Sequence, residues 1–506
     1  MNKILDVLEI KKILDKKRKR KKLKIGLCHG VFDLLHIGHI KHFDQAKKIC
    51  DYLIVSVTSD EFVNKGPSRP SFALNLRMDA LASLAKIDYV CSSNHATAIN
   101  NLKIIKPDYY IKGMEYKNFK NDLSGEIKNE IKIVKKIKAK IFYTKGITSS
   151  SSQLINNSFQ DNNKKKFFLE KIKNQFNYKK IQEVIDNFND EIPLVVGETI
   201  IDQYYFTEAI GKSGKEPNLV LRDLESEEFI GGAAAIAKNL SQYCKKVFLL
   251  TMIGEKSEYL KEIKNRLPKN IKIFYIKKDK SPTIIKKRYL DFVSKNKLLG
   301  VYKINDENLN KKQEKKLNNK FNFLKDKSTF IVVSDYGHGF LTKKISRNIA
   351  SQKKFVAINA QINANNIGYH SLENYKKVNC IIINEKELRH EMRNRTSEIK
   401  DLIKSFALKQ NVKDLIVTRG SNGALLFNKL KKSFYEIPAF ADKIVDKVGS
   451  GDNMLALSSL SLKNKNEKNL ALLLGSLAAA DNIKNFGNKK TVNKQNLLKS
   501  IDHLLK

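Results

Sequence analysis

GVFDLLHIGH, residues 30–39, and DKVGSGD, residues 446–452, are the two stretches that decide how this chain is organised. The first places two histidines three residues apart, where an apolar strand gives way to a helix. The second is a glycine-rich turn that ends on an aspartate and leads into another helix. Backbone N–H groups and the dipole at a helix N-terminus favour anions, so both stretches suit nucleotide phosphates. The sequence therefore predicts two active sites, one near each end of the chain.

The residues around the first stretch predict an α/β domain with a parallel sheet. A strand over 24–28, a helix over about 36–50 and a strand over 51–60 follow in βαβ order. Further strands are expected at the apolar runs 87–91, 109–112 and 140–143. We expect a Rossmann-like domain over residues 23–158, preceded by a leader helix over 1–22. Ligands of such a sheet bind at the carboxyl ends of its strands.

A second α/β pattern follows a connector. Residues 159–178, rich in Lys, Asn and Gln and free of Pro and Gly, predict a helical linker to a domain over 179–506. That domain is expected to begin with a helix at 180–188. Its strands are predicted at 192–198, 247–254, 329–337, 354–360, 379–385 and 414–420. The halves differ in motif and length, which indicates a fusion and not a duplication.

Composition narrows the choice of partner and compartment. The 506 residues are 42% hydrophobic and carry a formal net charge of +42, but the lysines are dispersed and no aromatic-rich platform accompanies them. This pattern is typical of solvated lysine faces and disfavours nucleic-acid binding. The five cysteines are widely spaced and odd in number, which predicts neither disulfides nor a zinc site and favours a reducing cytoplasm. The longest apolar stretch, residues 470–480, is too short for a membrane span.

The histidine motif suits nucleotidyl transfer. This reaction displaces pyrophosphate from the α-phosphorus of a nucleoside triphosphate, so its site must stabilise several negative charges. His36 and His39, with Gly38 between them, can direct both imidazoles at phosphates on the helix N-terminus. Gly30 allows the preceding strand to turn tightly beneath the nucleotide.

GVFDLLHIGH is similar to the HxGH signature of the cytidylyltransferase-like nucleotidyltransferases. The resemblance implies that Gly30, Phe32 and Gly38 border the nucleotide. Later segments resemble the heptose-1-phosphate adenylyltransferases: VNKGPSRP (63–70), LRMDAL (76–81), PDYYIKGMEY (107–116) and ITSSSSQLI (147–155).

These later segments imply further contacts. By the resemblance, Lys65 and Arg77 meet phosphates, and Lys112 meets the sugar phosphate or the leaving group. Ser151 and Ser152 cap a nucleotide-binding helix. A solvated lysine is the alternative for Lys65 and Lys112, and a plain helix cap is the alternative for the two serines.

The glycine-rich motif at residues 446–452 suits a second reaction, phosphoryl transfer. A kinase that transfers a γ-phosphoryl group to a sugar hydroxyl requires a carboxylate base beside an anion hole. Asp452 and the amides of residues 449–451 fit these roles, although a plain turn is the alternative for this motif alone.

The second half resembles the ribokinase-like (PfkB) sugar kinases. The segments that carry the resemblance are GETIIDQY (197–204), FIGGAAAIAKNL (229–240), VVSDYGHGFL (332–341), INEKEL (383–388) and VTRGSNGALL (417–426). It implies that the sugar is held by Asp202, Gly231, Gly232 and Asn239. It implies that Asn384 and Glu387 organise Mg²⁺ and phosphate, Glu387 acting on the metal indirectly. The residues implied at ATP are Thr418, Gly420, Gly423, Gly449 and Gly451, with Asp452 as base. Strands near Tyr204 and over 284–302 are expected to form a small β lid.

Together the halves resemble the bifunctional heptose-7-phosphate kinase/heptose-1-phosphate adenylyltransferases of lipopolysaccharide precursor synthesis, with the two domains in reversed order. The implied reactions are phosphorylation of a sugar phosphate at its anomeric hydroxyl and nucleotidyl transfer giving an ADP-sugar. ATP and Mg²⁺ are the expected nucleotide and cofactor, CTP is possible at the first site, and a homodimer is expected. Asn359-Ala360-Gln361 stands where those kinases usually read Asp-Pro-Lys, so another sugar is an alternative. A cytidylyltransferase for a polyol phosphate fused to another sugar kinase is the second alternative.

Overall fold

The computed structural model describes residues 3–63, 69–114, 127–144, 163–216, 218–361, 366, 370–441 and 444–505. The chain divides into two compact units, residues 1–163 with 495–506, and residues 164–494. Both units are α/β, which confirms the predicted fold class. The domain limits inferred from sequence stay predictions, although a helix occupies both the leader and the connector.

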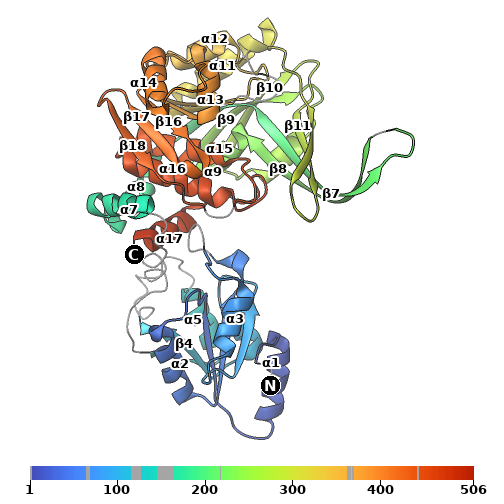
Figure 1. Ribbon diagram of the computed structural model, residues 1–506, viewed down its shortest axis with the longest axis vertical. Helices are drawn as coiled ribbons and strands as arrows, with labels where there is room; N and C mark the ends of the chain where they lie inside the picture. The colour runs from blue at the N-terminus through green and yellow to red at the C-terminus, as the bar shows by residue number, and fades with distance from the viewer. Residues whose placement is uncertain are drawn as a thin grey trace. The chain divides into compact units, whose positions relative to one another are not determined.

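The first unit is built on a parallel sheet in the order β3-β2-β1-β4-β5 (Figure 1). The strands are β1 (Ile25–Gly30), β2 (Tyr52–Thr58), β3 (Tyr89–Ser93), β4 (Tyr109–Gly113) and β5 (Lys140–Thr144). All five had been predicted from their apolar runs. Because β1 pairs with both β2 and β4, the chain order reverses beside β1. Ligands of open α/β sheets bind at such a switch point, which here faces the 30–39 stretch.

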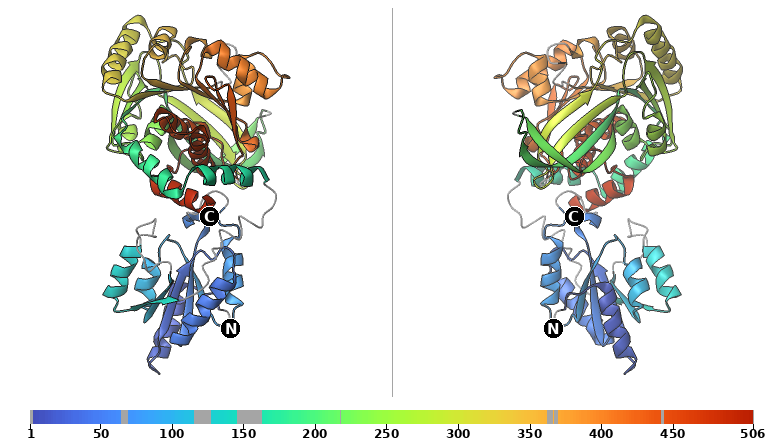
Figure 2. Two further views of the ribbon diagram at one scale, coloured as in Figure 1. Left: turned by 90° about the vertical axis from the view of Figure 1, so that its left-hand side faces the viewer. Right: turned by 90° about the vertical axis from the view of Figure 1, so that its right-hand side faces the viewer.

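Helices cover both faces of this sheet (Figure 2). They are α1 (Val7–Arg18), α2 (Ile37–Ile49), α3 (Leu74–Ala82), α4 (Ile99–Ile105) and α5 (Ile127–Lys136). A further helix, α17 (Lys494–Leu505), does not belong to this layer arrangement. Phe43 of α2 and Leu81 of α3 pack in one apolar cluster, and Leu14 of α1 and Leu102 of α4 pack in another. The sheet is therefore buried on both sides, which explains why its strands are almost uninterruptedly apolar.

The second unit contains a nine-stranded sheet in the order β10-β9-β6-β13-β14-β15-β16-β17-β18. Its first seven strands are parallel, and the last two pair antiparallel at one edge. The strands are β6 (Pro193–Gly197), β9 (Val247–Gly254), β10 (Ile271–Lys278), β13 (Phe330–Asp335), β14 (Phe355–Ala360), β15 (Cys380–Asn384), β16 (Asp414–Thr418), β17 (Ala424–Asn428) and β18 (Ser433–Ile437). The six predicted strands are confirmed, whereas β10, β17 and β18 had not been predicted.

The helices of this unit lie in two layers. Figure 1 shows α11 (Lys311–Asp326), α12 (Lys343–Ala350), α13 (Glu385–Glu391) and α14 (Ile399–Gln410) on one face of the sheet. The other face is covered by α9 (Ala233–Leu240), α15 (Ser450–Lys463) and α16 (Lys468–Asn482). The remaining helices are α7 (Asn163–Gln175), α8 (Tyr178–Asp186) and α10 (Leu260–Arg266). Residues 452–462 of α15 are all buried, so this helix forms part of the core.

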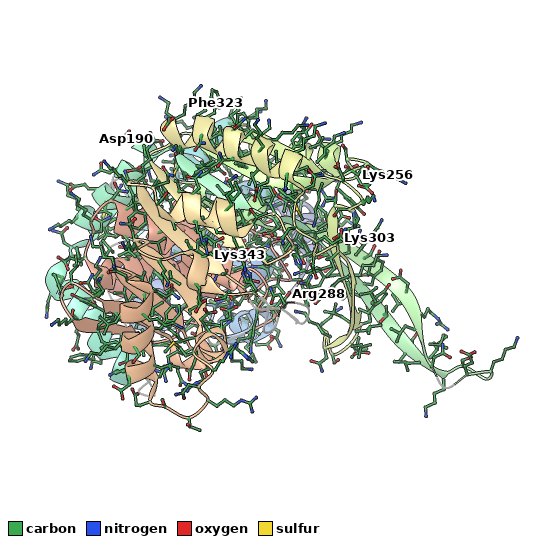
Figure 3. The ribbon with its side chains drawn as sticks, turned by 90° about the horizontal axis from the view of Figure 1, so that it is seen from above. Asp190, Lys256, Arg288, Lys303, Phe323 and Lys343 are labelled. Carbon is green, nitrogen blue, oxygen red and sulfur yellow. The ribbon has the colours of Figure 1, made fainter. Side chains whose placement is uncertain are left out.

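A separate four-stranded sheet, in the order β12-β11-β7-β8, forms the predicted lid. Its strands are β7 (Thr199–Lys212), β8 (Leu219–Gly232), β11 (Ile284–Asp291) and β12 (Lys297–Lys303). The β7–β8 hairpin is buried at its base and exposed toward its tip, which projects from the unit (Figure 3). Arg288 on β11 lies where the lid joins the body of the unit (Figure 3).

Two expectations from composition can be compared with the structure. All five cysteines are buried with free thiols. Within the described ranges, no helix has the length and apolar character required to span a bilayer.

Candidate active sites

The larger unit encloses a cavity of about 570 Å³ at the carboxyl ends of its parallel strands and beneath the lid. Predicted site residues that line it are Asp202, Gly232, Asn384, Glu387, Thr418, Gly420, Gly423, Gly449, Gly451 and Asp452. These residues come from segments spread over about half the chain. Gly231 and Asn239 do not line the cavity.

Asp452 lies in the first turn of α15, is 3% exposed and faces the cavity. The hydroxyl of Tyr336 donates to its carboxylate, at 3.1 Å from Oδ1 and 3.4 Å from Oδ2. Burial raises the pKa of Asp452 to about 7, and the charge of Asp202 acts in the same direction. The Tyr336 hydrogen bond and the charge of Lys286 oppose this rise in pKa. The carboxylate can therefore exchange a proton near neutral pH.

The turn before α15 is held by Asp446, a residue whose role was not predicted. The Asp446 side chain is 1% exposed and accepts from Tyr204 Oη at 2.5 Å and Lys297 Nζ at 2.6 Å. It also accepts from the backbone N–H groups of Val448 at 3.2 Å and Gly487 at 3.1 Å. Burial favours the neutral acid, but these hydrogen bonds outweigh it and hold the pKa of Asp446 below its usual value. Asp446 thus fixes the loop that presents the glycine amides.

Two glycines are required by the backbone around the cavity. Gly449 has φ +83°, and a Cβ there would lie 2.1 Å from Asn488 Oδ1. Gly423 has φ +77°, and a Cβ there would lie 1.9 Å from the carbonyl oxygen of Ile437. Side chains are disfavoured at both positions by conformation and by space.

At the lid end of the cavity, Asp202 on β7 forms a buried ion pair with Arg288 on β11. A Cβ on Gly231 would lie 2.4 Å from Asp202 Oδ2, so this glycine makes room for the carboxylate. Lys286, also on β11, lines the cavity and is 7% exposed. Its Nζ has no hydrogen-bonded acceptor in the described part of the chain and lies 5.2 Å from the Tyr336 ring centroid. Burial lowers the pKa of Lys286.

Asn384 and Glu387 are joined by a reciprocal cap at the start of α13. The Asn384 side chain accepts from the Glu387 N–H at 2.9 Å, and the Asn384 N–H donates to Glu387 Oε2 at 2.8 Å. This cap directs both side chains to the cavity wall. Their oxygens belong to the ligand class that Mg²⁺ prefers.

Asn359 and Gln361, the departure noted in the sequence, also line the cavity. Asn359 Nδ2 donates to the carbonyl oxygen of Ile382 at 2.7 Å, which orients the amide. Its Oδ1 is buried and has no hydrogen-bond partner among the described residues. Compared with Asp-Pro-Lys, the sequence Asn359-Ala360-Gln361 therefore places two neutral amides, and not two opposite charges, in the cavity wall.

In the smaller unit, His36 is the N-cap of α2, and its Nδ1 accepts from the Gly38 N–H at 3.1 Å. The His36 and His39 rings lie 4.0 Å apart between centroids. Phe32 packs edge-on against His39 at 5.3 Å and would contact any Cβ placed on Gly30. Burial lowers the pKa of His36, which favours the neutral imidazole. The predicted histidines and glycines are therefore brought together.

Arg77 is placed differently from the expectation that it meets phosphates. Its guanidinium is buried and donates to the carbonyl oxygens of Phe72, Val31 and Thr58, at 2.5–2.9 Å. It also donates to the Asp60 carboxylate at 2.6 Å. Since protein acceptors take up most of its donors, Arg77 ties the loops after β1 and β2 together.

Asp33, inside the histidine motif, was not singled out from the sequence. Its buried carboxylate accepts from the N–H groups of Ser71 at 2.7 Å and Phe72 at 3.0 Å. It also pairs with Arg69 at 3.1 Å. Asp33 therefore holds the segment from 69 to 72 beside the motif.

Lys112 lies at the end of β4, with Nζ 3.1 Å from Glu130 Oε2 and 5.1 Å from the Tyr110 ring centroid. Tyr110 Oη also donates to Glu130, at 2.9 Å. Lys112 is thus a half-buried, ion-paired cation and not a solvated surface lysine. Lys65, Ser151 and Ser152 lie outside the described residues.

Comparison with known proteins agrees with the division of the chain into two α/β units. Residues 193–494 match the pfkB family carbohydrate kinase profile, and residues 27–158 match the cytidylyltransferase-like profile. The bifunctional protein HldE of Nitratiruptor sp. is 38% identical over 139 residues, 27% of this chain and 30% of that protein. The bifunctional protein HldE of Hahella chejuensis is 42% identical over 95 residues, 18% of this chain and 20% of that protein. The matches therefore span less than a third of these relatives.

Solved structures show the fold of the larger unit. Phosphofructokinase-2 from Escherichia coli, in complex with substrates and products, superposes with a TM-score of 0.50 at 15% identity. The match covers 63% of this chain and all of that one. At this identity the likeness extends to the fold alone.

Proposed function

Because the chain belongs to the pfkB family of carbohydrate kinases, we propose that its larger unit uses Mg-ATP to phosphorylate a sugar phosphate at the anomeric hydroxyl. The observation that carries this proposal is the buried carboxylate of Asp452 at the N-terminus of α15, inside the cavity. Asp452 accepts the hydroxyl proton, and the N–H groups of residues 449–451 stabilise the transferring phosphoryl group. A base with a pKa of about 7 suits neutral pH.

Glu387 and Asn384 are the residues proposed to hold Mg²⁺ together with the nucleotide phosphates. The described part of the chain has no cluster of three His, Cys, Asp or Glu side chains suited to a metal. This fits Mg²⁺, which usually takes one or two carboxylates and completes its shell with phosphate oxygens and water. When bound, the ion neutralises charge on the phosphates.

The smaller unit is proposed to carry out nucleotidyl transfer on the sugar 1-phosphate. The phosphate of that product attacks the α-phosphorus of a nucleoside triphosphate, and pyrophosphate leaves. Neutral His36, together with His39, donates to the phosphates at the start of α2, where the helix dipole favours anions. ATP, giving an ADP-sugar, is the proposed donor nucleotide.

Lys286 supports a phosphorylated sugar as substrate of the kinase cavity. A buried ammonium without a hydrogen-bonded acceptor is unfavourable unless a ligand supplies an anion. The neighbouring cation, Arg288, is already neutralised by Asp202. We propose heptose 7-phosphate, on the motif resemblance, with its phosphate near Lys286.

Asn359 and Gln361 favour the second candidate, a kinase for a different sugar phosphate. An amide pair in place of a carboxylate and an ammonium removes one negative and one positive charge from the cavity wall, so the ligand meets neutral hydrogen-bonding groups there. Assays with CTP as well as ATP test the accompanying alternative, a cytidylyltransferase.

A single experiment on the full chain tests both sites. Wild type, Asp452→Asn and His39→Ala are each incubated with Mg-ATP and a panel of sugars and phosphosugars, with and without CTP, and the products are identified by mass spectrometry. Asp452→Asn should abolish sugar phosphorylation but spare nucleotidyl transfer to a supplied sugar 1-phosphate, and His39→Ala should do the reverse. Survival of both activities in both variants would refute the assignment of sites.

The substrate class has its own test. Lys286→Met should raise the KM for the phosphosugar at least tenfold and leave the KM for ATP within twofold. Lys343→Met, at an exposed position on α12 that does not line the cavity, is the matched control. An unchanged phosphosugar KM in Lys286→Met would contradict an anion site at the lid.

A homodimer formed through the lid is also proposed. Every residue of β12 is exposed, including the apolar Leu298, Leu299 and Val301. Within the described ranges β12 pairs with β11 alone, so it forms an edge of the sheet that another copy of the chain can cover. Light scattering should give twice the chain mass, and Leu299→Glu should shift it to the monomer; a monomeric wild type would contradict the proposal.

A further inference from the structure

Tyr336 makes a contact with the proposed base that no sequence motif indicated. It is the first residue after β13, is 5% exposed and lines the cavity. Its hydroxyl reaches both oxygens of Asp452, at 3.1 and 3.4 Å, and donates to them. A carboxylate held this way from within the core has a restricted orientation.

The turn that carries Tyr336 is itself fixed by buried groups. Glu198, which is fully buried, accepts from the N–H groups of Tyr336 at 3.1 Å and His338 at 3.2 Å. Asp335 accepts from the Gly337 N–H at 3.0 Å. These contacts engage the N–H groups of all three residues of the turn, so the Tyr336 hydroxyl is presented by a rigid support.

We propose that Tyr336 is a positioning residue for phosphoryl transfer: its hydroxyl orients the Asp452 carboxylate toward the sugar and stabilises it in the ionised form. The inference rests on the proposed role of Asp452 as base. In the reaction, Asp452 takes the proton of the sugar hydroxyl while the new O–P bond forms and the bond to ADP breaks. Tyr336 keeps its own proton throughout.

The pH dependence of the reaction reports on this contact. The charged or titratable groups that act on Asp452 are Asp202 from β7, Lys286 from β11 and Tyr336 from the turn after β13. Arg288, the remaining cation of this wall, is paired with Asp202. Burial and Asp202 raise the pKa of Asp452, whereas Tyr336 and Lys286 lower it. Removing the tyrosine hydroxyl should therefore raise the pH at which the base becomes ionised.

The test compares the full-length wild type with Tyr336→Phe, measuring kinase kcat and KM from pH 5.5 to 9.5. We expect kcat at pH 7 to fall about tenfold, the KM for ATP to stay within twofold, and the acid limb to move up by about one pH unit. Nucleotidyl transfer by the same preparation should be unchanged, which verifies that the chain is folded. Tyr243→Phe is the matched control, because that buried hydroxyl donates to the Val492 carbonyl oxygen at 2.9 Å and does not line the cavity.

Glu198→Gln provides a second variant that leaves the tyrosine in place. An amide can accept one but not both of the two turn N–H groups, so a smaller shift of the acid limb in the same direction is expected. An acid limb at the wild-type pH in both variants would overturn the inference, as would equal losses in Tyr336→Phe and Tyr243→Phe. If Asp452→Asn retains kinase activity, the proposed function fails; if it is inactive while Tyr336→Phe behaves as wild type, only the role of Tyr336 fails.

Discussion

Asp446→Asn should loosen the turn that carries the glycine amides and Asp452. Oδ1 of Asp446 accepts from Lys297 and Val448, and Oδ2 accepts from Tyr204 and Gly487. An asparagine has one acceptor oxygen and one NH₂ group. The NH₂ group must face one of these two pairs of donors, and the buried donors of that pair then lose their acceptor. Each lost hydrogen bond to a charged acceptor is worth about 1.5–3 kcal/mol.

The net effect on stability is smaller than the sum of these bonds. Lys297 is 42% exposed, so its ion pair is screened by solvent and contributes little. We therefore expect Asp446→Asn to destabilise the larger unit by about 2–4 kcal/mol at pH 7. Because the folded pKa of Asp446 lies below its unfolded value, the carboxylate stabilises the fold above the unfolded pKa, and this stabilisation is lost as the pH falls through the folded pKa. The difference between wild type and variant should accordingly shrink in acid.

Urea unfolding of the full chain at pH 7 and at acidic pH measures this change, and hydrogen exchange of residues 446–451 localises it. Kinase activity should fall at least tenfold, while nucleotidyl transfer is retained. Asp190→Asn makes the same chemical change at an exposed position of the larger unit and serves as control (Figure 3). Stability within 0.5 kcal/mol of wild type, together with kinase activity within twofold, would refute the reasoning.

Three further outcomes are expected. Kinase kcat/KM for the sugar phosphate should rise with pH through about 7, because the ionised form of Asp452 is the active one; a profile flat from pH 5.5 to 9 would contradict this. Gly449→Ala should lose kinase activity and about 1–2 kcal/mol of unfolding free energy, since φ is +83° and the new Cβ would meet Asn488; unchanged urea unfolding would count against it. Asp33→Asn should slow pyrophosphate release at least tenfold without affecting sugar phosphorylation, because its contacts with Arg69 and the following segment are weakened; equal loss of both activities would instead indicate misfolding.

The strands that were predicted correctly are those whose signal comes from residues adjacent in the sequence. Buried parallel strands are continuous apolar runs, so β1, β2, β6 and β9 could be located from the apolar runs of the sequence. The short strand pair β17 and β18 was missed, since five-residue segments at a sheet edge carry a weak periodic signal.

The same division applies to the sites. His36 and His39 belong to one helix start, and Gly449 and Asp452 to another, so the position of each pair at a helix start could be predicted from seven to ten residues of sequence. Tyr336 and Asp452 are 116 positions apart, so their contact could not be predicted from a local sequence pattern. For Arg77 the sequence motif predicted a contact with phosphate. In the structure its buried guanidinium donates to carbonyl oxygens at the ends of β1 and β2 and so links the two loops.

Sequence reasoning was sufficient to locate most of the buried parallel strands, the two helix starts that we propose bind anions, and the residues in their first turns. Those properties follow from periodicity and from backbone geometry over a few residues. Two contacts required the three-dimensional arrangement: Asp446 accepts a hydrogen bond from Tyr204, 242 positions away, and Lys286 is buried beside Tyr302 and Tyr336 with no hydrogen-bonded acceptor among the residues that the structure describes. Such contacts depend on which strands become neighbours in a sheet, and burial then sets how strongly each charge is felt.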